Sequence, residues 1–152
     1  MTSTDHDIKV LNNLIETTID SAEGYGEAAK DADNTRYAAQ FQSRASERRQ
    51  VASKLQQQVR SLGGNPEDDG TVLAKAHRMF VELRAKMSSK DDTAIVDEVE
   101  RGEDHIKAKY EDALKDTDVT AGTRSLINEA YVSVKQGHDQ MRDLKHALHG
   151  TN

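Results

Sequence analysis

Apolar residues recur every three or four positions along most of the chain, which is the spacing of one face of an α-helix. The alternation typical of a β-strand is not sustained in any segment. The pattern therefore predicts an all-α protein with four long helices and a short fifth helix between the second and the third. The long helices are expected from Thr4 to a polar turn at 31–34 and over 35–62, 93–115 and 123–148, and the short one over 71–87.

The same spacing predicts which residues face the core. In the first helix the series of inward positions includes one polar residue, Thr18. The apolar members of the four long helices are Ile8, Leu11, Ile15, Ala22, Tyr25 and Ala29; Tyr37, Phe41, Ala45, Val51, Leu55, Val59 and Leu62; Ile95, Val99, Ile106, Tyr110 and Ala113; and Ile127, Tyr131, Val134, Met141, Leu144 and Leu148.

Polar and glycine-rich stretches mark the ends of these helices. We expect the first helix to begin at Thr4, with Asp7 completing a capping box three residues later. The stretch "GGNPEDDG" (63–70) ends the second helix, because paired glycines and a following proline terminate helices.

The lengths of the connections predict the topology. A tight turn joins the first two helices, so they are antiparallel neighbours. The short fifth helix lies in a connection of about thirty residues and would span ~25 Å, at ~1.5 Å per residue. This length predicts one long crossover and hence a ferritin-like four-helix bundle. We expect one domain over 4–148, with flexible termini at 1–3 and 149–152.

Composition narrows the function. Cysteine is absent, which excludes disulfides, thiolate metal sites and cysteine nucleophiles. The net charge is −6 and no basic block is present, so nucleic acid is not an expected partner. No apolar run approaches the ~18 residues of a membrane span, and no charged-then-apolar leader begins the chain. We therefore expect a cytoplasmic protein with no membrane partner, and no small-molecule substrate can be identified.

Two short stretches repeat each other. "YGEAAKD" (25–31) ends the first helix and "YEDALKD" (110–116) ends the third. Thr18 precedes the first tyrosine by seven residues, and Glu103 precedes the second by the same spacing. The repeat favours a bundle built from two related helix pairs, although such helix ends also match by chance because their residues are common on helices.

Longer motifs resemble a known family. "LNNLIETTIDSAEGYGEAA" in the first helix, "LGGNPEDDG" after the second and "VERGEDHIKAKYEDAL" in the third are similar to a bacterial family of ferritin-like four-helix-bundle proteins of unassigned function, domain-of-unknown-function family 2383. The resemblance implies the fold and a distant kinship with ferritins, bacterioferritins and rubrerythrins. It implies no reaction.

The wider ferritin-like pattern implies six metal-ligand positions. A bacterioferritin has a glutamate seven residues before a tyrosine in its first and third helices, and Glu-x-x-His in its second and fourth. Three of the six ligands are present in this chain, Glu47, Glu103 and His138, whereas the other three positions hold Thr18, Gln50 and Lys135.

Three of the six ligands are too few to bind two metal ions. A centre of two iron or manganese ions needs about four carboxylates and two imidazoles. Lys135 would place an ammonium where a metal cation belongs, and the two positive charges would repel each other. At ~4 Å and an effective dielectric of ~20, one pair of unit charges interacts with an energy of ~4 kcal/mol. We therefore predict that a polar cluster replaces the metal, with Lys135 as its cation. Its members are Thr18, Glu47, Gln50, Glu103, Lys135 and His138.

Simpler interpretations remain for each of these residues. Glu47 and Lys135 can point outward, as most charged helix residues do. His138 lies at core spacing and is expected to be a hydrogen-bonded interior histidine. Tyr25 and Tyr110 are expected to pack in the core. His146 and His149 form an exposed pair at a helix end, His77 and His105 have no ligand-spaced partner, and Glu98, Glu100, Glu103 and Asp104 are typical of a solvated face.

Two functions follow. The preferred one is a non-enzymatic bundle protein without a cofactor, which acts by self-association, as a dimer for example, or by partner association in a stress response. The alternative is an iron or manganese protein with oxidase, peroxidase or metal-handling activity. Its metal ligands would be Glu47, Glu103 and His138, helped by Glu16, Glu23 or Glu100.

Overall fold

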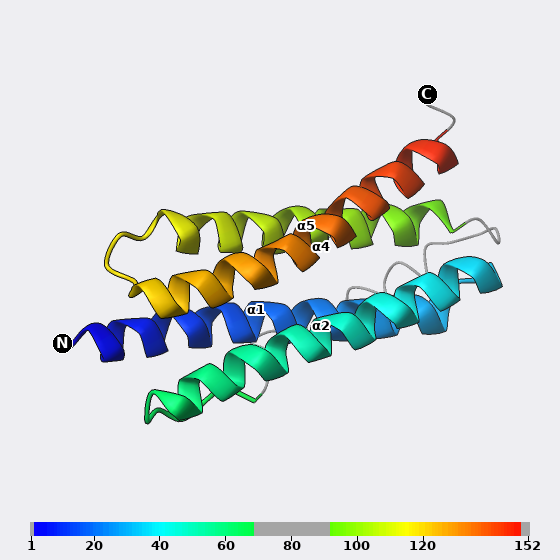
Figure 1. Cartoon of the computed structure of the whole chain (residues 1–152). Coiled ribbons are helices and arrows are strands. Elements are labelled where there is room, and N and C mark those ends of the chain that lie inside the picture. The colour runs from blue at the N-terminus through cyan, green and yellow to red at the C-terminus, as the bar shows by residue number, and fades with distance from the viewer. Residues whose placement is uncertain (1, 69–91, 150–152) are drawn as a thin grey trace.

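The computed structural model describes residues 2–68 and 92–149, and within them it contains four helices and no strand. The helices are α1 (Ser3–Asp31), α2 (Thr35–Ser61), α4 (Thr93–Lys115) and α5 (Ala121–Leu148) (Figure 1). The prediction of an all-α bundle is confirmed. The predicted short helix at 71–87 lies outside the described residues.

The four helices form two antiparallel pairs, α1 with α2 and α4 with α5, and α1 also packs against α4 (Figure 1). The end of α2 lies beside the start of α1, where the Asn12 side chain donates to the Asn65 carbonyl at 3.1 Å. The start of α4 lies beside the α1–α2 turn, where Asp92 accepts from the backbone of Asp33 and Asn34 at 3.0 and 2.9 Å. The connection from α2 to α4 therefore joins opposite ends of the bundle.

The end of α2 has the geometry that its paired glycines predict. Gly63 has a φ of +86°, and the Gly64 N–H donates to the Val59 carbonyl at 2.9 Å, which is the hydrogen bond of a Schellman motif. Gly64 also lies against α1, because a Cβ added to it would be 2.8 Å from Ile8 Cδ1. This close approach fixes the end of α2 against the first turns of α1.

The start of α1 differs from the prediction. Thr2 caps the helix, and its capping-box partner is Asp5 rather than Asp7. Thr2 and Ser3, which were expected in a flexible terminus, thus belong to the helix and its cap. Asp7 instead lies on the buried side of α1, four residues before Leu11, and only 1% of its surface is exposed.

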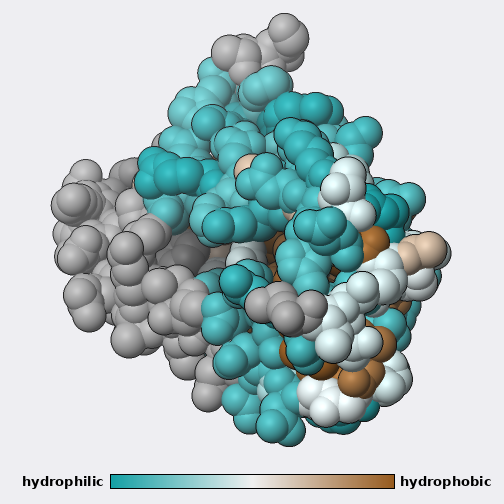
Figure 2. Space-filling model, turned by 90° about the vertical axis from the view of Figure 1, so that its left-hand side faces the viewer, coloured by the Kyte–Doolittle hydropathy of each residue, from teal (hydrophilic) through white to brown (hydrophobic). Residues whose placement is uncertain are grey.

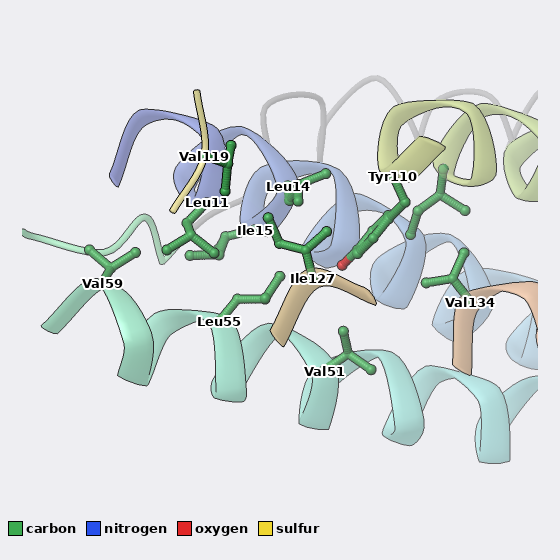
Figure 3. Close-up of a cluster of buried hydrophobic side chains, with 11 residues drawn as sticks. Leu11, Leu14, Ile15, Val51, Leu55, Val59, Tyr110, Val119, Ile127 and Val134 are labelled. Atoms are coloured by element: carbon green, nitrogen blue, oxygen red, sulfur yellow. The ribbon is translucent and has the colours of Figure 1, made fainter. Parts of the chain in front are cut away.

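Two apolar clusters fill the bundle. One of them takes side chains from all four helices, and Figure 3 labels among them Leu11 and Ile15 of α1, Leu55 and Val59 of α2, Tyr110 of α4, and Ile127 and Val134 of α5. The other contains Phe41 from α2, Ile95, Val96 and Val99 from α4, and Met141 from α5, with Tyr25 and Ala28 from α1.

The surface of the described residues is largely polar. Seen from the end where α1 begins, it is mostly hydrophilic with small apolar patches (Figure 2). Val132 is the single large hydrophobic side chain that is exposed in the described ranges. None of the described helices is both long enough and apolar enough to cross a bilayer.

Asp7 caps a helix other than its own. It accepts from the Thr120 N–H at 3.0 Å and from the Thr120 hydroxyl, and Thr120 is the N-cap residue of α5. Burial alone would raise the pKa of Asp7, but these hydrogen bonds outweigh it and lower the pKa below its ordinary value of 3.8. The carboxylate also faces the positive end of the α5 dipole.

We expect Asp7→Asn to lower the free energy of unfolding at pH 7 by about 1–3 kcal/mol, because a buried charge-assisted cap is lost. A lowered pKa stabilises the protein above the unfolded-state pKa, and this stabilisation is lost as the pH falls through the folded-state pKa. Urea unfolding should thus show a difference between wild type and variant that shrinks from pH 7 to pH 3. Asp112→Asn, at an exposed position of α4, serves as the control and should change little.

Candidate functional site

A layer of polar side chains separates the two apolar clusters. Arg48 of α2 and Glu103 of α4 have 0% and 1% of their surface exposed. Charged residues are almost never buried so fully unless they are paired. We call this layer the polar centre; it consists of Thr18, Ser21, Tyr25, Arg48, Glu103 and Tyr110.

Arg48 and Glu103 form a bidentate ion pair. The Nη1–Oε1 and Nη2–Oε2 distances are both 2.8 Å. The guanidinium also donates to Ser21 Oγ at 2.8 Å and to the Val134 carbonyl at 3.3 Å. Burial alone would lower the pKa of Arg48, but the Glu103 carboxylate outweighs it and the pKa is raised. The two opposite charges therefore compensate each other inside the bundle.

Tyr25 completes the environment of this pair. Its hydroxyl donates to Glu103 Oε1 at 2.7 Å, and Arg48 Cζ lies 5.6 Å from the centre of its ring. Burial, together with the Glu103 charge, raises the pKa of Tyr25 well above its ordinary value of 10. The phenol consequently remains a hydrogen-bond donor to the carboxylate at any physiological pH.

The two tyrosines of the sequence repeat bond reciprocally. Tyr25 of α1 bonds Glu103 of α4, and Tyr110 of α4 lies 2.7 Å from the Thr18 hydroxyl of α1. Each acceptor is the residue seven positions before the other tyrosine. Burial raises the pKa of Tyr110 to about 12, so it too stays protonated. The repeat thus has a structural meaning, because equivalent positions of α1 and α4 bond across the bundle.

A glycine makes room for the guanidinium. Gly137 of α5 is buried, and a Cβ added to it would overlap with Arg48 Nη2 and lie 3.2 Å from Arg44 Cδ. Glycine is unfavourable in the middle of a helix by roughly 0.5–1 kcal/mol relative to alanine. At this position the lack of a side chain lets Arg48 lie against the α5 backbone.

Comparison with protein families assigns the chain to one of them. A family model described as a domain of unknown function (DUF2383) matches residues 6–116. The chain belongs to the DUF2383 family. The match includes every residue of the polar centre, whereas Gly137 on α5 lies beyond it. No curated protein matches the chain.

The structure places the six predicted cluster residues of this DUF2383 protein in different environments. Thr18 and Glu103 are buried in the polar centre. Gln50 and Lys135 are exposed and take no part in it. Lys135 follows inward-facing Val134 directly, so the helix turns it away by about 100°. The cation of the centre is therefore Arg48 and not Lys135.

The other two predicted residues lie at the edges of the bundle. Glu47 has a side chain that is 32% exposed, and it accepts from Arg44 at 2.5 Å and from Ser133 Oγ at 2.7 Å. His138 bonds Asp104, with 2.7 Å between Nε2 and Oδ1. Among the described residues Glu47, Glu103 and His138 are not a group whose ligand atoms converge.

Arg48 was missed from the sequence because the core positions were assigned to apolar residues alone. Phe41, Ala45, Ala52, Leu55 and Val59 are all buried, and position 48 continues their spacing of three and four. The signal was thus a basic residue at a core position of α2. Its spacing from Ala45 and Ala52 would have identified it.

Among the other predicted histidines and acidic residues that the structure describes, Glu103 alone belongs to the polar centre. His149 bonds Asp97 at 2.8 Å, His105 and His146 are exposed, and His77 lies outside the described residues. The acidic stretch of α4 is not one solvated face, because Glu103 is buried. Its other members, Glu98, Glu100 and Asp104, pair with Arg101, Lys145 and His138 respectively.

Proposed function

We propose that the protein is a non-enzymatic, ferritin-like bundle that acts by self-association, and that the Arg48–Glu103 pair replaces the metal centre of such bundles. The observation that carries the proposal is the guanidinium, 0% exposed and held by two 2.8 Å contacts to the carboxylate. The crossover that joins opposite ends of the bundle supports the ferritin-like topology. A cytoplasmic location and a role in stress conditions remain predictions from the sequence.

The side chains of the polar centre do not suit two metal ions. A carboxylate-bridged pair needs about four carboxylates and two imidazoles, and the centre contains one carboxylate and no imidazole. That carboxylate, Glu103, is already bonded to Arg48 and Tyr25. A divalent cation there would face the positive guanidinium at contact distance, where like charges repel by several kcal/mol.

Association is supported by the distribution of charge. The net charge is −6, yet α2 contains six basic residues and one acidic residue. Arg49 and Arg60 of α2 are exposed, and a spacing of eleven residues places them within about 20° of each other around the helix axis. Carboxylates outnumber basic side chains on the groove between α1 and α4, where the charged lining residues are Glu16, Asp20, Glu98, Arg101, Glu103, Lys109 and Asp112.

The groove is the complementary surface. Burial, together with the charges of Glu67 and Asp20, raises the pKa of Glu16, which indicates carboxylates that repel one another. Basic side chains from outside would relieve this repulsion. We therefore propose that the exposed basic face of α2 in one copy contacts the α1–α4 groove of another copy, and that charge rather than apolar area selects the partner.

Self-association should weaken with salt and depend on α2. We expect the sedimentation-equilibrium Kd of the wild type to rise about tenfold or more between 50 and 500 mM NaCl, because exposed charge pairs are screened. The Arg49→Glu/Arg60→Glu variant should associate at least tenfold more weakly at 50 mM NaCl. Lys115→Glu/Lys135→Glu, at exposed positions that do not line the groove, makes the same change in net charge and is the matched control.

Three outcomes would contradict the proposal. A monomer at millimolar concentration and low salt would exclude self-association. Equal weakening in both double variants would indicate a general charge effect rather than a basic α2 face. Near-stoichiometric iron or manganese in protein purified without chelators, lost in Glu103→Gln, would favour the metalloprotein alternative.

A further inference from the structure

Three metal-ligating side chains meet at the outer seam between α4 and α5. They are Glu100 and Asp104, one turn apart on α4, and His138 on α5, and their ligand atoms all lie within 4.8 Å of one another. We propose that they bind one divalent transition-metal ion, with zinc as the best fit, outside the polar centre. Zinc takes imidazole nitrogen and carboxylate oxygen ligands and accepts water as the fourth.

The orientation of the imidazole is the first support. His138 Nδ1 lies 3.2 Å from Asp139 Oδ1, and Nε2 lies 2.7 Å from Asp104 Oδ1. Metal-bound histidines commonly donate the other ring N–H to a carboxylate, which fixes the tautomer. When Nδ1–H donates to Asp139, the lone pair of Nε2 faces the Asp104 carboxylate. A metal ion between Nε2 and Asp104 would then be bound by both, whereas in the other neutral tautomer Nε2–H donates to Asp104 directly.

The third ligand is a largely buried carboxylate with a weak partner. The Glu100 side chain is 14% exposed, and its ion pair with Lys145 spans 3.4 Å. The Lys145 side chain is 36% exposed, so its ammonium can move into water when a metal ion displaces it. Glu100 would then turn its oxygen toward Asp104 and His138.

The charges around the site favour a divalent ion. Three carboxylates face it, those of Glu100, Asp104 and Asp139. The nearby cations are Lys145 and Arg142, whose Nη1 lies 3.5 Å from Asp139 Oδ1. The three carboxylates therefore outnumber the two nearby cations. Glu103 takes no part, because Arg48 holds it inside the bundle.

A second group of ligating side chains is less suitable. His6, Asp116 and Asp118 also converge. Asp116, however, accepts from the Asp118 N–H at 2.9 Å and from His6 at 2.7 Å, and Asp118 is exposed on a loop. The α4–α5 site draws its ligands from two packed helices, so fewer side chains must be ordered when the metal binds.

The test is a zinc titration of the full chain, free of any affinity tag and of chelator, in a His6→Ala background that removes the second group. We expect calorimetry to give one zinc per chain, and the Tm to rise by about 5–10 °C at a hundredfold excess over Kd. His138→Ala should weaken zinc binding at least tenfold. His149→Ala removes the C-cap histidine of α5, which pairs with Asp97, and should leave binding unchanged.

Asp104→Asn keeps the size of the side chain and tests the same site without removing the histidine. It should also weaken zinc binding at least tenfold, and cobalt bound to the His6→Ala protein should lose its visible absorption in this variant. Unchanged zinc affinity in His138→Ala and Asp104→Asn would overturn the proposal, as would equal loss in His149→Ala or no binding below millimolar zinc. These results are independent of the self-association test, because Arg49 and Arg60 are not altered.

Discussion

Replacing Arg48 with methionine is expected to lower the free energy of unfolding by about 3–5 kcal/mol, because the buried Glu103 carboxylate would lose the cation that compensates its charge. Methionine retains much of the side-chain volume, so the loss reports the charge rather than a cavity. Urea unfolding at pH 7, followed by circular dichroism, measures the difference. It is the largest effect that we expect from a single substitution in this chain.

Two further variants provide the controls, one at the neighbouring Arg49 and one at the ion-pair partner Glu103. Arg49 is exposed, so Arg49→Met should change the stability by less than about 0.5 kcal/mol. Glu103→Gln in the Arg48→Met background removes the orphaned charge and leaves a carbonyl for the Tyr25 hydroxyl, so it should recover most of the loss. A double variant as unstable as Arg48→Met alone would show that the loss does not come from an unpaired Glu103.

Replacing Gly137 with alanine is expected to lower the free energy of unfolding by about 1–3 kcal/mol, against the usual preference of helices for alanine. The new Cβ would overlap with Arg48 Nη2 and press on Arg44 Cδ, 3.2 Å away. The guanidinium would have to leave its place against Val134 and Glu103. Thermal and urea unfolding of the variant measure the cost.

Gly102 offers a matched comparison. It lies in the middle of α4, and a Cβ added there meets nothing within 4 Å. Gly102→Ala should therefore raise the stability by about 0.5–1 kcal/mol. In the Arg48→Met/Glu103→Gln background, Gly137→Ala should lose its cost, because the flexible methionine can move aside. A Gly137→Ala protein as stable as Gly102→Ala would mean that the guanidinium does not need this space.

The helices could be predicted from the sequence because their signals are local. The range 93–115 agrees with α4 at both ends, since an apolar stripe and polar flanks define it. The start of α1 was placed two residues late, because Thr2/Asp5 and Thr4/Asp7 have the same capping-box spacing. Which of the two threonines caps the helix depends on Asp7 meeting Thr120, a contact between residues far apart in the chain.

The polar centre was only half predictable. Thr18 and Glu103 were found because each precedes a tyrosine by seven residues. Gln50 and Lys135 were chosen by their place in a Glu-x-x-His pattern, which disregards the direction in which each residue leaves its helix. Arg48 follows Glu47 and precedes another arginine, and its burial depends on the space above Gly137, which belongs to a different helix.

The bidentate pair also determines how the helices slide along one another. In α4, the inward neighbours of Glu103 one turn away are Val99 and Ile106. A slip of α2 by one turn would bring Arg48 opposite one of these apolar side chains and leave two unpaired charges in the interior. Apolar side chains alone tolerate such a displacement, because one aliphatic contact substitutes for another. The pair thus selects a single axial register, and it excludes the sliding motions by which bundles with uniform cores exchange between alternative packings.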